Sequence, residues 1–361
     1  MPKLRGLVVD DAVMMRRLIS MVLETDARIE VAGIAANGSL AIQKLTQLNP
    51  DFVTLDVEMP EMDGLATLRA LRQTHPRLPV IMLSLATQRG AIVTLDALAA
   101  GASDYVTKPQ NVANLDEAIA LLQRSLLPKV HALCGSGGAT PAPPALPVAV
   151  PSADAGNRRG FPSPLELICL ATSTGGPNAL SEIFAALDCA PPVPIAIVQH
   201  MPEHFTRLLA ERIDRAPGAV RCSEALDGER LEPGRAYLAP GGRHLAIERR
   251  AGHLHARLLD TPPENSCRPS ADVLFRSAAA AVGGGVLAVV LTGMGSDGAR
   301  GAAQLHEAGA TILAQDEATS VVWGMPGAVV RAGLADDLLP LARVAPAILR
   351  RARGAPPVAV S

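Results

Sequence analysis

The chain has 361 residues, enough for about two domains. Its 33 lysines and arginines nearly balance its 35 aspartates and glutamates, and only 2% of its residues are aromatic, so neither charge nor base stacking favours a nucleic-acid partner. The five cysteines lack C-x-x-C spacing and no apolar run is long enough to cross a membrane, so we expect reduced thiols, no membrane insertion and a cytoplasmic location.

Residues 1–126 alternate between apolar runs typical of buried strands and amphipathic stretches typical of helices. Five strand–helix units of this length predict an α/β domain, a doubly wound parallel sheet with helices on both faces. The expected strands are 7–10, 29–35, 52–57, 80–85 and 104–107, and the expected helices are 13–23, 40–48, 64–73, 91–100 and 112–126.

Polar residues stand where these expected strands end. Asp10 and Asp11 follow the first strand, and Asp56, Ser84 and Lys108 follow the third, fourth and fifth. Because ligands bind at the carboxyl edge of a parallel sheet, these side chains should share one pocket. Crowded carboxylates repel one another unless a divalent cation binds, and a few oxygen ligands suit Mg²⁺. The metal and Lys108 would neutralise a phosphoryl group transferred to Asp56.

With these positions matched, residues 1–126 resemble a response-regulator receiver domain, which has a flavodoxin-like fold. The resemblance implies that Asp56 is phosphorylated, with Mg²⁺ required for that step. It also implies a metal site and a set of switch residues that respond to the phosphoryl group: Asp10, Asp11, Asp56 and the region of Glu58 for the metal, and Ser84, Lys108 and Tyr105 for the switch.

Residues 127–164 break the alternation. They are rich in Gly, Ala, Pro and Ser and include A-T-P-A-P-P-A-L-P, which cannot bury a core, so we expect a partly extended linker. Residues 351–361 are expected to form a flexible tail.

Residues 165–350 alternate again and predict a second α/β domain, with a doubly wound, mostly parallel sheet. The more polar part, 243–259, alternates over shorter distances and predicts an antiparallel hairpin. The expected buried strands are 167–171, 195–198, 236–239, 286–291 and 311–314.

Three residues of this second half stand at ends of expected strands and suggest nucleophilic catalysis. Ser173 follows the first strand in S-T-G-G-P, His200 follows the second in Q-H-M-P, and Asp297 lies in the loop T-G-M-G-S-D-G. A serine needs a base within hydrogen-bond reach and a group that orients the base. Each residue also has a simpler interpretation. Ser173 could be a helix N-cap or part of a phosphate-binding turn, and Asp297 could be a helix cap. His200 could be a structural or surface histidine, with His204 as a competing candidate for the base.

The loop after the fourth expected strand also permits two functions of other classes. Gly293, Gly295 and Gly298 form G-x-G-x-x-G between a strand and a helix, with Asp316 ending the next strand, which is the pattern of a dinucleotide site. That fingerprint normally opens its domain, and it would leave S-T-G-G-P and Q-H-M-P unexplained. A catalytically inactive, phosphorylation-dependent interaction module is the other alternative.

The second half, read as a whole, resembles the chemotaxis methylesterases of the CheB family. The resemblance rests on S-T-G-G, Q-H-M-P, D-G-E-R-L-E-P-G-R-A-Y-L-A-P-G, R-P-S-A-D-V-L-F, L-T-G-M-G-S-D-G and V-W-G-M-P, in this order between residues 165 and 339. Where the family usually reads G-A-S-T-G-G, this chain has Ala171 and Thr172 before Ser173, a bulkier turn.

The resemblance implies a substrate, partners and residue roles. The substrate would be γ-glutamyl methyl esters on methyl-accepting chemoreceptors, with methanol released, and receptor glutamines would be deamidated. A chemotaxis histidine kinase would donate the phosphoryl group, and ester hydrolysis would need no cofactor. Ser173 would be the nucleophile, His200 its base and Asp297 the orienting acid. Beyond the resemblance, we expect backbone N–H groups near His200 and Met294 to form the oxyanion hole. Arg207 and Arg268 either face the acidic receptor surface or are solvated surface arginines.

Overall fold

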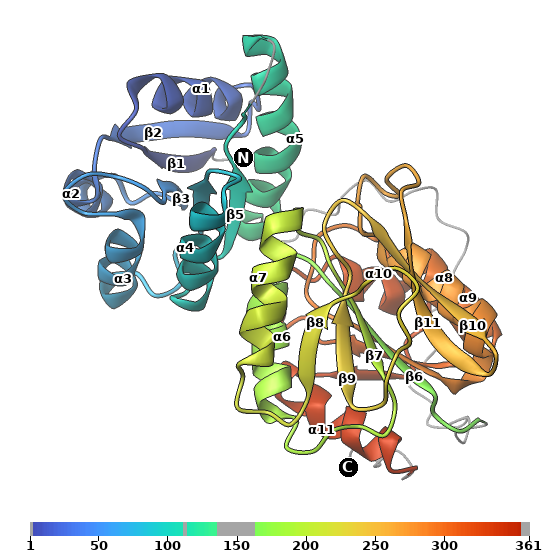
Figure 1. Cartoon of the computed structure of the whole chain (residues 1–361). Coiled ribbons are helices and arrows are strands. Elements are labelled where there is room, and N and C mark those ends of the chain that lie inside the picture. Colours follow the sequence, from blue (N-terminus) through green and yellow to red (C-terminus); the bar gives the residue numbers. More distant parts are fainter. Residues whose placement is uncertain (1–2, 111–113, 136–162, 355–361) are drawn as a thin grey trace. The chain divides into compact units, whose positions relative to one another are not determined.

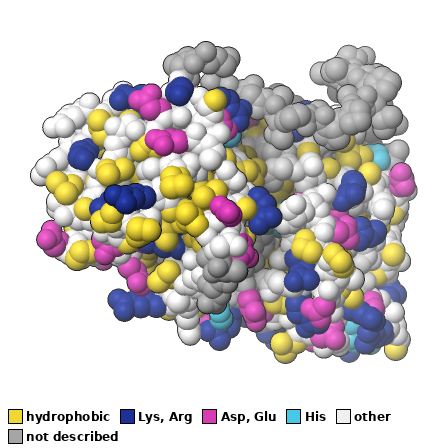
Figure 2. Space-filling model, turned by 90° about the horizontal axis from the view of Figure 1, so that it is seen from above, with side chains coloured by type: hydrophobic (Ala, Val, Ile, Leu, Met, Phe, Trp, Pro, Cys, Tyr) yellow, Lys and Arg dark blue, Asp and Glu magenta, His cyan; other side chains and the backbone are white. Residues whose placement is uncertain are grey.

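The structure is a computed structural model that describes residues 3–110, 114–135 and 163–354. The chain forms two compact units, Met1–Thr140 and Pro141–Ser361, each of which is described by itself (Figure 1). Among the described residues, no helix is both long and apolar enough to span a bilayer. Acidic and basic side chains are interspersed on the face shown in Figure 2.

The first unit is a five-stranded parallel sheet in the order β2-β1-β3-β4-β5, with helices between the strands (Figure 1). The predicted fold class is therefore confirmed for this half. Its strands are β1 (Leu4–Val9), β2 (Ile29–Ala35), β3 (Phe52–Asp56), β4 (Val80–Ser84) and β5 (Asp104–Thr107), and its helices are α1 (Val13–Glu24), α2 (Gly38–Leu48), α3 (Gly64–Thr74), α4 (Gln88–Ala99) and α5 (Leu115–Cys134).

Helix α5 is longer than predicted, and residues 127–134, which we assigned to the linker, belong to it. Pro128 lies inside the helix and removes a single backbone donor. The helix continues because Leu126 and Val130, one turn apart, are both fully buried in the core of this unit. Beyond the helix, the predicted linker over 136–162 lies outside the described residues.

The second unit is a seven-stranded parallel sheet in the order β14-β13-β12-β6-β7-β9-β8, together with a separate two-stranded antiparallel sheet. The doubly wound sheet and the hairpin are therefore both confirmed. The strands are β6 (Leu167–Thr172), β7 (Ile195–Gln199), β8 (Arg221–Glu224), β9 (Arg235–Leu238), β10 (His244–Arg250), β11 (His253–Leu259), β12 (Val286–Val290), β13 (Thr311–Gln315) and β14 (Asp337–Leu339).

Helices cover both faces of this sheet (Figure 1). Helix α6 packs against α7 and α11, whereas α8 packs against α9 and against the hairpin strand β10. The helical segments are α6 (Gly176–Ala186), α7 (Glu203–Asp214), α8 (Ala271–Val282), the 3₁₀ turn η1 (Gly283–Gly285), α9 (Ala299–Glu307), α10 (Met325–Arg331) and α11 (Leu341–Ala352).

Three features of the second unit differ from the sequence prediction. The edge strands β8 and β14, of four and three residues, were not predicted. Helix α11 ends at Ala352 and its Arg351 is only 4% exposed, so the first two residues of the predicted tail are helical. Residues 355–361 of that tail lie outside the described residues.

The strand order places a binding crevice at one point of the sheet edge. From β6 the chain moves outward through β7 on one side and later through β12 on the other. The carboxyl ends of β6 and β12 therefore form a topological switch point, where ligands bind in open α/β sheets.

Candidate active site

Ser173 stands directly after β6, on a turn that leads into α6. The N–H of Gly176 donates to the Ser173 carbonyl at 2.8 Å, and Gly175 between them has a φ of 80°, which a residue without a side chain adopts at no steric cost. The preceding Thr172 is fully buried, and its hydroxyl donates to the Thr292 carbonyl at 3.0 Å. The bulkier Thr172 is thus accommodated within β6, and Ser173 remains half-buried at the sheet edge.

The neighbouring strand ends hold this turn in place. Gln199, at the end of β7, donates its side-chain N–H to the Ser173 carbonyl at 3.0 Å. The Ser173 N–H donates to Thr292 at 3.1 Å, just after β12. Gly293 comes so close that an added Cβ would lie 2.9 Å from the Ser173 Cβ, which real Cβ atoms essentially never show. The Ser173 turn is therefore fixed by both adjacent strands.

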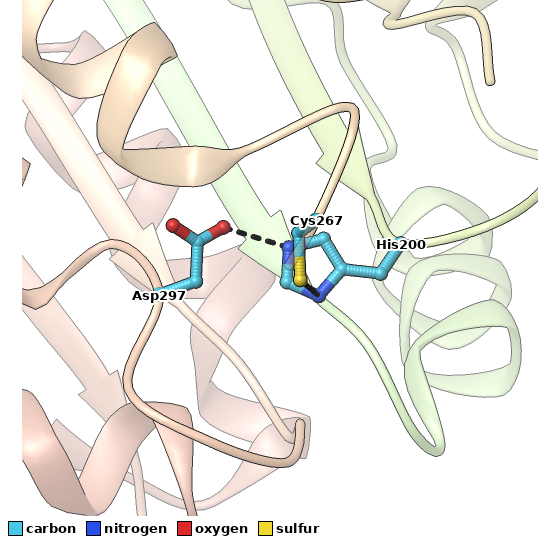
Figure 3. Close-up of side chains that lie close together, drawn as sticks. All are labelled: His200, Cys267 and Asp297. Carbon is cyan, nitrogen blue, oxygen red and sulfur yellow. Dashed lines mark hydrogen bonds and ion pairs between the residues drawn. The ribbon is translucent and has the colours of Figure 1, made fainter. Parts of the chain in front are cut away.

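His200 and Asp297 meet at the same edge, as predicted (Figure 3). Nε2 of His200, which follows β7, lies 2.8 Å from Oδ2 of Asp297, in the loop between β12 and α9. The side chains are 12% and 2% exposed, so the pair is largely shielded from water. His204 lies on the exposed first turn of α7 and has no such carboxylate partner among the described contacts, which favours His200 over His204 as the base.

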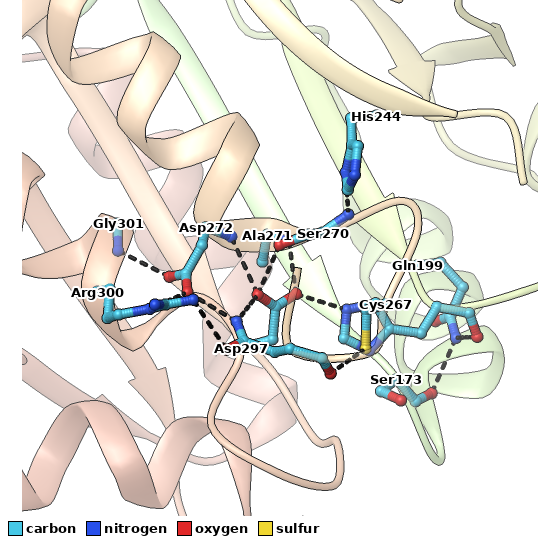
Figure 4. Close-up of polar contacts among 12 residues, drawn as sticks. Ser173, Gln199, His244, Cys267, Ser270, Ala271, Asp272, Asp297, Arg300 and Gly301 are labelled. Carbon is cyan, nitrogen blue, oxygen red and sulfur yellow. Dashed lines mark hydrogen bonds and ion pairs between the residues drawn. The ribbon is translucent and has the colours of Figure 1, made fainter. Parts of the chain in front are cut away.

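Asp297 is held by donors from the start of α8 (Figure 4). Its Oδ1 accepts the Ser270 hydroxyl at 2.7 Å and the Asn265 side-chain N–H at 2.8 Å, and its Oδ2 accepts the Ala271 N–H at 2.6 Å. A carboxylate at a helix N-terminus is further stabilised by the helix dipole. Asp297 is therefore an ionised, immobile partner of His200 and does not cap its own helix α9, whose N-cap is Gly298.

These contacts shift the pKa values of both groups. Burial acts to lower the pKa of His200, but the hydrogen bonds to Asp297 and Cys267 and the carboxylate charge outweigh it and raise the pKa to about 9. Burial acts to raise the pKa of Asp297, but the contacts with His200, Ser270 and Ala271 hold it well below its usual range. The pair therefore favours an imidazolium beside a carboxylate.

The second nitrogen of His200 contacts a residue that the sequence analysis did not single out. Nδ1 lies 3.6 Å from Sγ of Cys267 (Figure 3). Figure 4 shows Ser173 on the far side of Cys267 from Asp297. Asp297 is paired with Nε2, so Nδ1 is the ring nitrogen that remains on the side of Cys267. The R-P-S-A-D motif that follows Cys267 is the sequence feature that could have indicated a role for this loop in the site.

Asn265, Ser270, Asp272 and Arg300 were also missed. Asn265 bonds both Asp297 and Asp272, and Arg300 bonds Asp272 at 3.0 Å and the Asn265 oxygen at 2.9 Å. Asp272 also accepts the Gly301 N–H at 2.7 Å. These residues form a second layer of polar contacts that ties the loop before α8 to α9.

Two of the predicted roles fit the structure poorly. The backbone N–H of His200 donates to the Thr172 carbonyl at 3.2 Å as part of the β6–β7 pairing, which counts against His200 as an oxyanion donor. The Gly293 N–H donates to Val322, and the Gly293 carbonyl accepts from Gly324 and Met325. That glycine therefore serves close packing rather than a phosphate, and the dinucleotide interpretation loses its support. A donor at Met294 stays a prediction.

Arg207 and Arg268, predicted to face the receptor, are both exposed. Arg207 lies on α7, and Arg268 donates to the Thr261 carbonyl at 3.2 Å in the loop that carries Cys267.

The first unit brings its predicted pocket together at the edge of its own sheet. Nζ of Lys108 lies 2.7 Å from Oδ2 of Asp10 and 2.7 Å from Oδ2 of Asp56. Burial raises the pKa of Asp56, and although Lys108 lowers it, the result is about 6. Asp11, Glu58 and Ser84 line the cavity beside Asp56. Tyr105, on β5, is buried, with Nζ of Lys129 5.1 Å from its ring centre.

The donor set of this pocket fits a magnesium ion. Carboxylate oxygens of Asp10, Asp11 and Asp56 lie within 4.8 Å of one another, and Asp11 is exposed to solvent. Hard oxygen ligands around an accessible cavity are what Mg²⁺ requires, because it keeps several waters.

Comparisons with known proteins place both units in known families. Residues 168–348 match the CheB methylesterase family, and residues 7–120 match the response regulator receiver domain. The chain belongs to the CheB methylesterase family. It is a methylesterase preceded by a receiver domain, and both matched ranges fall within the domains expected from the sequence.

Relatives match over nearly the whole length of the chain. A protein-glutamate methylesterase/protein-glutamine glutaminase of Nocardioides sp. is 52% identical over 97% of this chain and 96% of its own, and one of Trichodesmium erythraeum is 46% identical over 97% and 99%. The CheB methylesterase catalytic domain of Thermotoga maritima superposes with a TM-score of 0.51 at 37% identity, covering 52% of this chain and 99% of that domain.

Proposed function

We propose that this chain hydrolyses glutamate methyl esters on chemoreceptors and deamidates receptor glutamines, with Ser173 as nucleophile, His200 as base and Asp297 as orienting acid. The observation that carries the proposal is the 2.8 Å contact between His200 and Asp297 beside Ser173 at the switch point of the sheet. Membership in a methylesterase family supports the same reaction class.

The ring orientation of His200 determines how the proton would move. Asp297 holds Nε2, so Nδ1 is the nitrogen that takes the Ser173 hydroxyl proton. The serine oxygen then attacks the ester carbonyl, and the imidazolium returns the proton to the departing methoxide, which leaves as methanol. His200 then takes a proton from water, the water attacks the acyl-enzyme, and the proton returns to the Ser173 oxygen as glutamate is released. With a glutamine substrate the leaving group is ammonia.

The proton transfer requires Ser173 and Nδ1 to approach each other. In the described part of the chain no hydrogen bond joins them, and Cys267 contacts Nδ1 instead. Catalytic hydrogen bonds are often long without substrate and tighten in the complex. We expect substrate binding to bring the Ser173 hydroxyl to Nδ1.

The receiver unit supplies the regulation. We propose that Asp56 accepts a phosphoryl group from a chemotaxis histidine kinase, with Mg²⁺ held by Asp10, Asp11 and Asp56 next to Glu58 and supplying charge neutralisation for that transfer. Lys108 contacts Asp56 and, with Ser84, lines the same cavity, and Tyr105 is buried on β5. Phosphorylation then shifts the population of domain arrangements toward the active enzyme.

Methanol release from methylated receptor membranes tests the esterase directly. We expect Ser173→Ala to abolish release, because the alanine lacks the hydroxyl that attacks the ester in the proposed mechanism. Ser181→Ala is the matched control, since that hydroxyl lies on α6 and donates to the Pro177 carbonyl at 2.8 Å, away from His200. Near-native turnover by Ser173→Ala would overturn the assignment.

A further inference from the structure

Cys267 is a second nucleophilic side chain at this site, in contact with the same histidine. Its sulfur lies 3.6 Å from Nδ1 of His200, and Nε2 of the same ring is paired with Asp297 at 2.8 Å. The order thiol, imidazole, carboxylate is one that proteins use to activate a cysteine. A ring nitrogen of His200, the sulfur of Cys267 and a carboxylate oxygen of Asp297 all lie within 4.8 Å of one another.

The loop holds Cys267 over the imidazole. Glu264 and Cys267 exchange backbone hydrogen bonds of 3.1 and 2.8 Å across a turn in which Asn265 and Ser266 both have positive φ. Asn265 is tied to Asp297, and Glu264 is tied to Arg276 at 2.7 Å. The thiol is therefore attached to the same network that orients His200.

The other cysteines of the described chain have different surroundings. Cys169 and Cys222 are buried, and burial raises the pKa of the Cys222 thiol to about 12. Burial likewise raises the pKa of Cys134 to about 12. Cys189 is half-buried like Cys267 but contacts Arg353 rather than a histidine. Cys267 alone among the described cysteines faces a histidine that is paired with a carboxylate.

We propose that Cys267 is a site of reversible oxidation by peroxides, and that its oxidation stops the esterase by occupying the side of His200 that must face Ser173. A thiol that lies next to a histidine cation, as Cys267 lies 3.6 Å from Nδ1 of His200, is in the kind of surroundings in which reactive cysteines are found. Burial acts to lower the pKa of His200, but its contacts with Asp297 and with Cys267 itself raise the pKa to about 9, which favours a positively charged ring beside the sulfur.

The chemical step balances without any group other than the peroxide. The sulfur attacks one peroxide oxygen and the O–O bond breaks; the sulfur is oxidised by two electrons to a sulfenic acid and the peroxide is reduced. The hydroxide that leaves takes up the thiol proton and becomes water. The new oxygen lies between Sγ and Nδ1, where it hydrogen-bonds the nitrogen that Ser173 needs. A thiol reductant restores the starting state.

Labelling of the full chain tests the reactivity independently of esterase activity. The protein is treated with hydrogen peroxide and dimedone, and adducts are located by mass spectrometry. We expect Cys267 to be labelled faster than Cys189, and His200→Gln to slow labelling of Cys267 on the order of tenfold, because the stabilising cation is lost. Ser173→Ala should label like the wild type. Equal labelling of both cysteines, or no slowing in a folded His200→Gln protein, would overturn the proposal.

The effect on activity rests on the proposed function and is measured separately. Each variant's methanol release is compared before and after peroxide, relative to its own untreated rate. The wild type and the matched control Cys189→Ser should lose activity and regain it with dithiothreitol, whereas Cys267→Ser should keep its own rate. Equal loss in Cys267→Ser would contradict the inhibition. Absence of methanol release from the untreated wild type would instead refute the esterase proposal and leave the labelling result standing.

Discussion

Replacing Asp297 by asparagine should remove most of the activity while leaving the fold in place. Asp297→Asn keeps the size of the side chain but loses the charge 2.8 Å from Nε2 of His200. Losing the orienting carboxylate of such a serine–histidine–acid set costs about 10⁴ in kcat, or about 5.5 kcal/mol of transition-state stabilisation. The asparagine amide would also face the donors of Ser270 and Ala271, so a stability loss of about 1–3 kcal/mol is expected.

The same substitution should move the pH profile. Without the carboxylate, burial of the imidazole is opposed only by the contact with Cys267, so the pKa of His200 falls and the rise of kcat/KM with pH shifts to lower pH. Asp272→Asn is the matched control, because that carboxylate is equally buried but bonds Asn265, Arg300 and Gly301 rather than His200. Methanol release is measured from pH 6 to 10, with urea unfolding in parallel. Our reasoning is refuted if Asp297→Asn keeps a tenth of the wild-type kcat or an unchanged pH profile.

Four further predictions concern the pH dependence of activity, the pH dependence of stability, packing and the receiver. Since a base must be neutral to act and the pKa of His200 is about 9, kcat/KM should fall about tenfold per pH unit below pH 9; a flat profile from pH 7 to 9 would exclude His200 as the base. The stability that His200 gains from its raised pKa should be fully present below its ordinary pKa of 6.5 and lost as the pH rises through about 9, which urea unfolding at several pH values checks. Gly293→Ala should lower kcat at least tenfold, because its Cβ would lie 2.4 Å from the Met325 sulfur and 2.9 Å from the Ser173 Cβ; unchanged kcat would show that the turn tolerates displacement. Asp56→Asn, or removal of Mg²⁺ by chelation, should abolish phosphate incorporation from acetyl phosphate but leave unphosphorylated methanol release intact, and a parallel loss of both would contradict separate sites.

The sequence predicted the location of Ser173, His200 and Asp297 because all three follow buried parallel strands. Strand runs such as 167–171 and 286–291 are uniformly apolar, and the carboxyl ends of parallel strands share an edge. The same rule predicted Asp10, Asp56 and Lys108 in the receiver. In both units, regular alternation was sufficient to place residues far apart in the chain beside one another.

Features that depend on strand register or on loop conformation could not be predicted from the pattern of apolar and polar residues. Whether the His200 N–H is paired depends on the β6–β7 register, which side-chain patterns do not specify. Cys267 reaches His200 only because Asn265 and Ser266 adopt positive φ, a conformation that no glycine signals here. The edge strands β8 (R-C-S-E) and β14 (D-L-L) are too short and too polar to show an apolar run.

The most direct test of the account is covalent capture of the nucleophile. The full chain is incubated with a fluorophosphonate, which forms a stable adduct with an activated serine, and the modified peptide is identified by mass spectrometry. We predict a single adduct on Ser173, lost in Ser173→Ala and strongly slowed in His200→Gln, with methanol release falling in proportion to labelling. An adduct on Cys267, or undiminished labelling of Ser173→Ala, would contradict the central claim that Ser173 carries the reaction.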